Sequence, residues 1–178
     1  MENKLTGGVV APDFTAQTWR GDGFSLHSLK GKKVWLAFFR YAACPLCNLR
    51  VREIIVNYGD ITKNGLEIIS VFQSPPESIA KYVGKQKPPF TMLSDPEENL
   101  YELYRLETSV AGFLNPANIV TGVKAMTSGF MPGKIEGSVT RIPGDFLIDA
   151  EMKIQTAFYG NAIKDHIPID MVMAFAGS

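Results

Sequence analysis

A run of apolar residues followed by two cysteines decides the fold: Val34-Trp35-Leu36-Ala37-Phe38-Phe39, then Cys44-Pro45-Leu46-Cys47. The apolar run shows no alternation with polar side chains, which is typical of a strand buried on both faces of a central parallel sheet. After the second cysteine, apolar side chains recur with the spacing of one buried helical face: Val51, Ile54, Ile55 and Tyr58. The sequence therefore predicts a strand, a short loop that ends at the first cysteine, and a helix.

Similar signals predict the remaining elements. Strands are expected at residues 66–72, 146–149 and 154–159, and the short segment 150–153 joins the last two as a hairpin. A polar capping residue followed by proline marks a first helical turn, because proline lacks an N–H that would have no partner there. Such pairs and the apolar spacing predict helices near residues 45–58, 75–84, 96–105, 116–127 and 168–176.

The order of these elements predicts the architecture. Strands separated by helices connect through right-handed parallel crossovers, whereas the last hairpin adds an antiparallel edge. We therefore expect an α/β fold in which helices flank a central mixed β-sheet. Residues 12–15 and 21–26 are expected to form an N-terminal β-hairpin extension, and the glycine-rich residues 109–139 a surface insertion. The length suits a single domain over residues 1–178.

Composition limits the classes of partner. Lys and Arg number 18, Asp and Glu number 18, and the formal net charge is zero. Because there is no basic block and no acidic tail, we expect neither nucleic acid nor a membrane as partner. No apolar run reaches the roughly 18–20 residues that span a bilayer. Residues 1–8 lack the apolar core of a signal peptide, so the expected location is cytoplasmic.

The chemistry is expected at Cys44 and Cys47, the only two cysteines of the chain. They cannot build a disulfide framework or, with His27 and His166 far away in sequence, a four-ligand zinc site, so neither a metal nor a cofactor is expected. Unpaired N–H groups and the helix dipole stabilise a thiolate at the start of a helix. One turn further on, the second thiol can attack a disulfide or sulfenic acid formed on the first. The pattern predicts Cys44 as nucleophile and Cys47 as resolving thiol.

Four further residues are candidates for a supporting role: Pro143, Arg141, Tyr41 and Arg40. A proline that enters a strand from a loop can be cis, which usually marks a shaped site, and an ordinary strand-start proline is the alternative. Either arginine can lower the pKa of a nearby thiol or hold an oxygen of the oxidant, and either can equally be a solvated surface side chain. The tyrosine can offer its hydroxyl to the sulfur or simply pack.

Several stretches then point to a family: Ala11-Pro12-Asp13-Phe14, Leu93-Ser94-Asp95-Pro96, Pro143-Gly144-Asp145-Phe146-Leu147-Ile148-Asp149 and Asp165-His166-Ile167-Pro168. Together with the Cys-Pro-x-Cys motif, they resemble the peroxiredoxin-like branch of the AhpC/TSA superfamily, over roughly residues 9–173. The resemblance implies a thioredoxin-like fold, in which Pro143 falls at the position of the cis-proline. It also implies a thiol peroxidase or thiol-disulfide reductase. Cys44 matches the peroxidatic position, and Cys47 matches the second cysteine of a thioredoxin-type pair.

The chain departs from the peroxiredoxin pattern before its first cysteine. Peroxiredoxins have a proline seven residues and a threonine or serine three residues before the peroxidatic cysteine, where this chain has Ala37 and Tyr41. Those family residues shape the peroxide pocket, so the departure favours disulfide exchange.

The sequence thus predicts an antioxidant thiol oxidoreductase that acts on a peroxide or a disulfide and is reduced by a thiol such as a thioredoxin-like protein. A thioredoxin-fold binding module with inert cysteines is the alternative. Apolar residues of the insertion can form a homodimer surface or pack within the loop: Val110, Phe113, Leu114, Phe130 and Met131.

Overall fold

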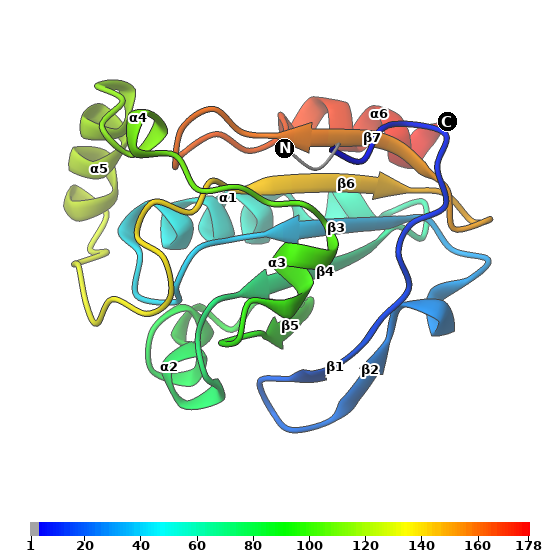
Figure 1. Cartoon of the computed structure of the whole chain (residues 1–178), viewed down its shortest axis with the longest axis horizontal. Helices are drawn as coiled ribbons and strands as arrows, with labels where there is room; N and C mark the ends of the chain where they lie inside the picture. The colour runs from blue at the N-terminus through cyan, green and yellow to red at the C-terminus, as the bar shows by residue number, and fades with distance from the viewer. Residues whose placement is uncertain (1–3) are drawn as a thin grey trace.

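The computed structural model describes residues 4–178 and contains one seven-stranded mixed sheet between layers of helices (Figure 1). Along the sheet, the strand order is β2-β1-β5-β4-β3-β6-β7. The strands are β1 (Thr15–Thr18), β2 (Gly23–Ser25), β3 (Val34–Phe38), β4 (Glu67–Phe72), β5 (Thr91–Ser94), β6 (Gly144–Ile148) and β7 (Ile154–Tyr159). The α-helices are α1 (Pro45–Thr62), α2 (Pro76–Lys81), α3 (Asn99–Leu103), α4 (Val110–Phe113), α5 (Ala117–Thr127) and α6 (Ile169–Gly177). Two short 3-10 helices are η1 (Leu26–Leu29) and η2 (Val83–Gln86).

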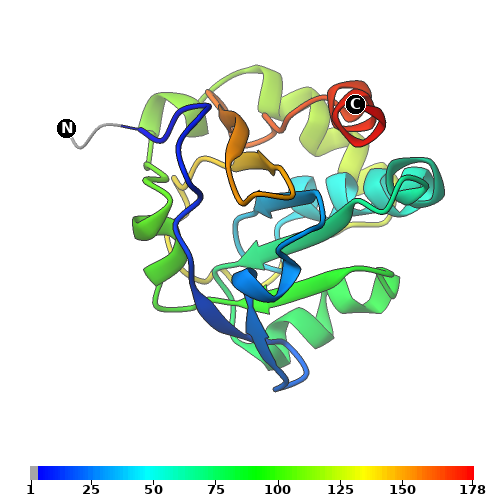
Figure 2. The same cartoon turned by 90° about the vertical axis from the view of Figure 1, so that its right-hand side faces the viewer.

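The central strand β3 is buried on both faces, as its apolar sequence predicts. It pairs in parallel with β4 and antiparallel with β6. Its side chains alternate between two cores, because successive residues of a strand point to opposite faces. Trp35 and Ala37 pack in the core that includes α1 and α6, whereas Leu36 and Phe38 pack in the core that includes α3. Figure 2 shows α1 and α6 on one side of the sheet and α3 on the other.

Both edges of the sheet are antiparallel hairpins. The predicted N-terminal hairpin is present as β1–β2, but its first strand begins at Thr15, where the expected strand over residues 12–15 ends; β1 also pairs antiparallel with β5. The predicted terminal hairpin is β6–β7, which closes the opposite edge. Strand β5 has no counterpart in the sequence prediction. It has four residues, too few to show a period, and it is defined by its parallel pairing with β4.

Two predicted helices differ from the observed ones. The segment expected as a helix over residues 75–84 is divided into α2 and η2. The helix expected at residues 96–105 is shortened to α3, because the Asp95 carboxylate accepts the N–H groups of Asn99 (3.2 Å) and Leu100 (2.8 Å) and so caps the helix there. The helix cannot begin earlier, because Glu98 has a φ of 59°, which lies in the left-handed region.

The predicted insertion at residues 109–139 contains α4, which the sequence did not predict, and α5. Figure 1 shows both helices beyond the carboxyl end of β3. There α5 packs beside the first turn of α1, since a Cβ added at Gly122 would lie 3.8 Å from a methyl group of Leu46. Among residues 4–178, no helix has the length and apolar character that crossing a bilayer requires.

The carboxyl-terminal segment is attached to the sheet through a buried aspartate. Asp145 of β6 is fully buried and accepts hydrogen bonds from Trp35 Nε1 (3.0 Å) and the Ile167 N–H (2.9 Å). His166 Nδ1 lies 3.0 Å from the same carboxylate. Burial is the largest single influence and opposes ionisation, but the charge and hydrogen bond of His166, the charge of Arg50 and the Ile167 N–H together lower the pKa of Asp145. This cluster fixes the approach to α6.

Candidate active site

Cys44 lies where the sequence predicts it, at the N-cap of α1 just beyond the carboxyl end of β3. Pro45 occupies the first helical turn. The Cys44 N–H donates to the Tyr41 carbonyl (3.1 Å), and the Cys44 carbonyl accepts from the Asn48 N–H (3.0 Å). Its sulfur therefore stands at the positive end of an 18-residue helix.

Arg40 is the cation that the fold brings to this sulfur. Its Nη1 donates to Cys44 Sγ at 3.5 Å, and its Nη2 donates to the Val139 carbonyl in the insertion. The guanidinium also lies 5.0 Å from the Tyr41 ring centroid and 5.9 Å from that of Phe113. Arg40 is 2% exposed, so its charge acts on the sulfur with little screening by water.

The two thiols have opposite pKa shifts. A hydrogen bond from Cys47, with help from the Arg40 charge and the N–H groups of Cys47 and Leu46, lowers the pKa of Cys44 to about 6 against the opposing effect of burial. Burial, followed by the hydrogen bond and the charge of Cys44, raises the pKa of Cys47 well above its ordinary value. At neutral pH the pair thus holds one thiolate, on Cys44, and one thiol, on Cys47.

Both cysteines are reduced and buried, with exposed fractions of 1% for Cys44 and 2% for Cys47. They belong to the same core cluster as Tyr41, Val51 and Trp35. A reactant therefore reaches the sulfurs only when the covering residues move apart.

Polar side chains hold the loop before Cys44 in place, and sequence reasoning missed them. Asn48 Nδ2 donates to the carbonyls of Ala42 (2.7 Å) and Cys44 (2.9 Å), and Gln86 Nε2 donates to Asn48 Oδ1 (3.0 Å). From the opposite side, Ser74 Oγ accepts the Ala42 N–H (2.9 Å). A signal was present for Asn48, a polar residue on the buried face of a helix one turn after the nucleophile.

The other predicted supporting residues differ in their distance from the chemistry. Tyr41 adjoins both cysteines, and burial followed by the charge of Cys44 raises the pKa of its phenol, which keeps its proton. Arg141 donates instead to the Leu106 carbonyl (2.7 Å) and the Glu98 carboxylate, and it lies 5.3 Å from the Tyr101 ring centroid. These contacts of Arg141 thus stabilise the wall behind the site.

Of the two alternatives for Pro143, the structure has the ordinary strand-start proline and not the cis proline that the resemblance implies. No peptide bond within residues 4–178 is cis. The Ile142 N–H donates to the Glu107 carbonyl (3.1 Å), and the Pro143 carbonyl accepts from the Gly160 N–H (3.0 Å). These bonds hold a trans, extended chain that continues directly into β6. Pro143 adjoins the carboxyl end of β3, because Gly144 pairs with Phe38.

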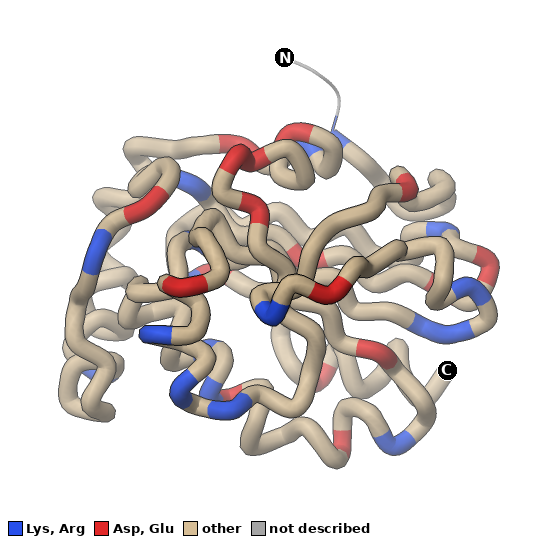
Figure 3. The backbone as a smooth tube through the Cα atoms, turned by 90° about the horizontal axis from the view of Figure 1, so that it is seen from below, with Lys and Arg blue, Asp and Glu red and all other residues tan. Residues whose placement is uncertain are grey.

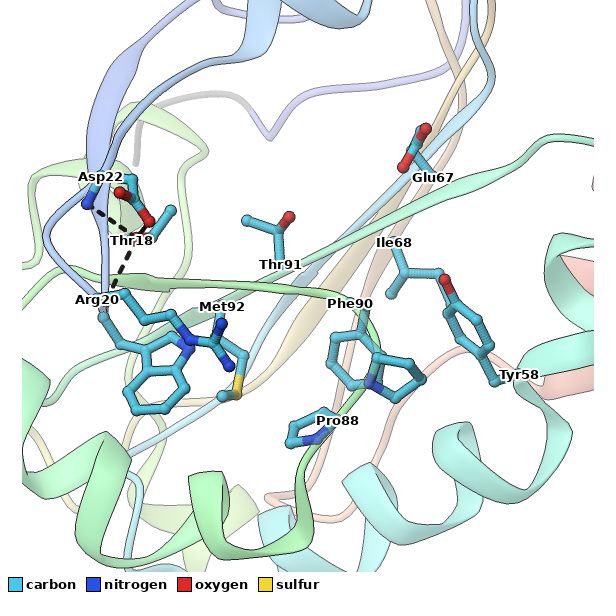
Figure 4. A pocket seen from close by; sticks show the side chains of 12 residues that line it. Thr18, Arg20, Asp22, Tyr58, Glu67, Ile68, Pro88, Phe90, Thr91 and Met92 are labelled. Atoms are coloured by element: carbon cyan, nitrogen blue, oxygen red, sulfur yellow. Dashed lines mark hydrogen bonds between the residues drawn. The ribbon is translucent and has the colours of Figure 1, made fainter.

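Two clefts lie at opposite ends of the sheet. The larger, about 420 Å³, is drawn in Figure 4 and is lined by Tyr58, Phe90 and the first residues of β4 and β5, Glu67 and Thr91. It therefore lies at the amino ends of the parallel strands, away from Cys44. The second, about 360 Å³, is lined partly by Ala43 and Asn48, beside the nucleophile.

The mixed sheet and the cysteine pair at the start of α1 define a thioredoxin-fold protein with a dithiol centre. Within this class, the chain belongs to the AhpC/TSA family, whose sequence profile matches residues 8–157. The peroxiredoxin Bcp of Escherichia coli strain K12 is 28% identical over 156 residues, which cover 88% of this chain and 86% of Bcp.

Solved structures agree on the fold. Peroxidoxin BcpB from Mycobacterium tuberculosis has a TM-score of 0.72 at 15% identity, over 98% of this chain and 97% of BcpB. Peroxiredoxin Q from Xanthomonas campestris has a TM-score of 0.67 at 16% identity, over 98% and 95% of the two chains. The predicted fold class, the family and the assignment to thiol-dependent oxidoreductases are confirmed.

Proposed function

We propose that this protein is a thiol peroxidase in which Cys44 reduces a peroxide and Cys47 resolves the oxidised product. The observation that carries the proposal is the Arg40–Cys44 contact of 3.5 Å, together with the lowered pKa of Cys44, about 6. The thiolate is the nucleophilic form of cysteine, and the N-cap environment supplies it at neutral pH. The naming of the E. coli relative as a peroxiredoxin supports the same assignment.

The proposed cycle has three balanced steps. The Cys44 thiolate attacks one peroxide oxygen, the O–O bond breaks, and the leaving alkoxide takes a proton and departs as an alcohol, or as water from hydrogen peroxide. The Cys47 thiol then attacks the sulfenic sulfur of Cys44, which releases water and forms a disulfide. A thiol reductant finally returns two electrons and two protons. We propose a thioredoxin-like protein for this role.

Arg40 and Tyr41 can donate the hydrogen bonds that the threonine or serine of the peroxiredoxin pattern gives to the reacting oxygens. Arg40 Nη1 already lies within hydrogen-bonding distance of the reacting sulfur. Tyr41 stands at the position of the family threonine or serine, and its raised pKa preserves the hydroxyl proton for a peroxide oxygen. Of the remaining candidates, we assign Pro143 to shaping the rim of the site and Arg141 to positioning its wall through Glu98.

Thiol-disulfide exchange is a second candidate, favoured by the Cys-x-x-Cys spacing and by Ala37 in place of the family proline. The two reactions are separated by measuring, on the same reduced preparation, stopped-flow oxidation by hydrogen peroxide and reduction of insulin disulfides. A peroxidase reacts with peroxide orders of magnitude faster than free cysteine does, whatever its insulin activity. Slow peroxide oxidation together with fast insulin reduction would reject the peroxidase in favour of exchange.

We also propose a homodimer that buries the exposed apolar surface of α4, α5 and the residues between them in the insertion. Large apolar side chains there are well exposed, with values of 75% for Val120, 69% for Ile119 and 68% for Leu114. Residues 108–135 contain no Asp or Glu that would oppose burial. Sedimentation equilibrium is expected to show a dimer for the wild type and a monomer for Val120→Lys. A monomeric wild type at high protein concentration contradicts the proposal.

Two broader assignments accompany this function. We propose that residues 1–178 form one domain, an assignment supported by the single sheet to which both the N-terminal and the C-terminal hairpins contribute strands. We propose a cytoplasmic location, because a dithiol that must be re-reduced in each cycle works where thiol reductants are abundant.

A further inference from the structure

A positively charged cleft lies beside the loop that precedes Cys44. This basic cleft, of about 360 Å³, is lined by three cationic side chains and no carboxylate: Arg52, Lys81 and Lys85. Its apolar wall includes Tyr82, Phe130 and Met131. The combination of a cationic rim and an apolar wall is suited to a molecule with an anionic end and an apolar body.

The three cations lack anionic partners in the protein. Within residues 4–178, none of them forms an ion pair, and Lys81 makes only a contact of 5.3 Å with the Tyr82 ring centroid. Other basic residues nearby are paired, such as Arg50 with Glu53 at 2.7 Å. Figure 3 shows acidic and basic residues interspersed along the backbone. The basic cleft is therefore a local excess of positive charge in a chain whose formal net charge is zero.

The basic cleft adjoins the nucleophile through its lining residues. Ala43 immediately precedes Cys44, and Asn48 donates its side-chain N–H to the Cys44 carbonyl at 2.9 Å. Gln86, also in the lining, donates to Asn48 Oδ1 at 3.0 Å. A molecule bound here contacts Ala43 and Asn48, the residues beside Cys44 that position it.

We propose that the basic cleft binds the carboxylate of an organic hydroperoxide whose peroxide group is reduced at Cys44. This inference rests on the proposed peroxidase function and names its preferred substrate class. Arg52, Lys81 and Lys85 bind the carboxylate, and the apolar wall contacts the carbon skeleton. The carboxylate is unchanged by the reaction. The products are the corresponding hydroxy acid and, after resolution by Cys47, water and the Cys44–Cys47 disulfide.

A matched pair of hydroperoxides tests the proposal: cumene hydroperoxide and its para-carboxylated derivative. We expect the reduced wild type to be oxidised about tenfold faster by the carboxylated compound at low salt, equivalent to about 1.4 kcal/mol. High salt is expected to reduce this preference, because screening weakens interactions between exposed charges. The triple variant Arg52→Gln/Lys81→Gln/Lys85→Gln should lose the preference and retain the wild-type rate with cumene hydroperoxide.

A second triple variant controls for net charge. Lys30, Lys63 and Lys153 are exposed and lie at the amino end of β3, at the end of α1 and at the β6–β7 turn. Their replacement by glutamine removes the same charge and should leave the preference intact. Equal rates for the two hydroperoxides in the wild type, or loss of the preference in this control, overturn the inference.

Direct binding separates this inference from the peroxidase proposal. The tertiary alcohol that corresponds to the carboxylated hydroperoxide cannot oxidise a thiol, and its binding can be followed by amide chemical shifts of the reduced protein. Saturable shifts at Ala43, Asn48 and Lys85 that are absent with the alcohol lacking the carboxylate support binding in the basic cleft. They do so even if neither hydroperoxide oxidises Cys44, although that second result would refute the peroxidase proposal. The absence of saturable shifts at these residues refutes the cleft.

Discussion

The guanidinium Nη1 of Arg40 lies 3.5 Å from Cys44 Sγ, and both residues are at least 98% buried. A charge placed this close to a sulfur in the protein interior acts more strongly than the same charge would in water. The Nη2 bond to the Val139 carbonyl holds the guanidinium against the sulfur and joins the cysteine loop to the insertion. This contact makes Arg40, rather than Arg141, the basic residue that lies against the Cys44 sulfur.

Replacing Arg40 by methionine should raise the pKa of Cys44 from about 6 toward the ordinary thiol value, because a stabilising positive charge is lost. The ultraviolet absorbance of the thiolate, followed against pH, measures this shift. Peroxide oxidation at neutral pH should slow in parallel. Arg20→Met serves as the control, since Arg20 stacks on Trp19 at 4.9 Å in the cleft at the opposite end of the sheet. An unchanged thiolate titration in Arg40→Met contradicts the assigned role.

The stability of the reduced protein should depend on the protonation of Cys44. Its folded pKa, about 6, lies below the ordinary value of 9.0, so the stabilisation is complete above 9.0 and is lost as pH falls through 6. The free energy of unfolding should therefore rise between these values, with a slope of at most about 1.4 kcal/mol per pH unit from this group. Urea unfolding of the wild type and of Cys44→Ser across this range checks the prediction. The two slopes should differ, and identical slopes would show that the thiol contributes nothing.

Cys47 should affect stability in the opposite direction at alkaline pH. Its folded pKa is raised well above 9.0, so the unfolded chain loses this proton first and the free energy of unfolding falls once pH exceeds that value. The same urea series, extended above 9.0 with Cys47→Ser as comparison, measures the effect. If the free energy of unfolding falls equally steeply in Cys47→Ser, the fall is due to other groups, such as the buried tyrosines.

Asn48→Ala should destabilise the protein by about 1–3 kcal/mol, because the carbonyls of Ala42 and Cys44 lose a buried donor. The matched control is Asn57→Ala in the same helix, where the exposed amide donates to the Glu53 carbonyl at 2.8 Å. That change should cost less than about 0.5 kcal/mol. Urea unfolding measures both variants. Equal losses would indicate that helix propensity, and not the bonds to the cysteine loop, decides the effect.

Mass spectrometry after mild peroxide treatment should separate the roles of the two cysteines. The wild type is expected to lose two hydrogens as the disulfide forms, whereas Cys47→Ser should retain one added oxygen on Cys44. Cys44→Ser should show neither change under the same conditions. Oxygen addition at Cys47 in that variant would contradict the assignment of Cys44 as nucleophile, since Cys47 would then be reactive by itself.

The sequence predicts the centre of this fold well, because the signals of β3 and α1 are local. A continuous apolar run and a 3.6-residue period need no knowledge of distant residues, and the helix start at Pro45 follows from proline chemistry. Strand β5 escapes prediction for the opposite reason. Thr91–Ser94 becomes a strand through its pairing with β4 and β1, which no four-residue pattern encodes.

The site is predictable only in part. The spacing of Cys44 and Cys47 by itself predicts a redox-active pair. The sequence does not tell which of Arg40 and Arg141 lies beside that pair. Tertiary packing alone distinguishes them, because Glu98 and the Leu106 carbonyl bind Arg141. The roles of Ser74 and Gln86 are also not predictable, because their hydrogen-bond partners Ala42 and Asn48 are far away along the chain. The trans Pro143 likewise lies between two long-range hydrogen bonds, from the Ile142 N–H to the Glu107 carbonyl and from the Gly160 N–H to the Pro143 carbonyl.

Gly133 packs so tightly on the cysteine loop that a single methyl group would not fit. A Cβ at this position would lie 2.9 Å from Ala43 Cβ and 2.7 Å from the Tyr82 ring. Ala43 therefore cannot move toward Gly133 without displacing it. If disulfide formation moves Ala43 in this direction, Gly133 and the insertion around it must move as well, so oxidation of the sulfurs is coupled to a distant part of the chain.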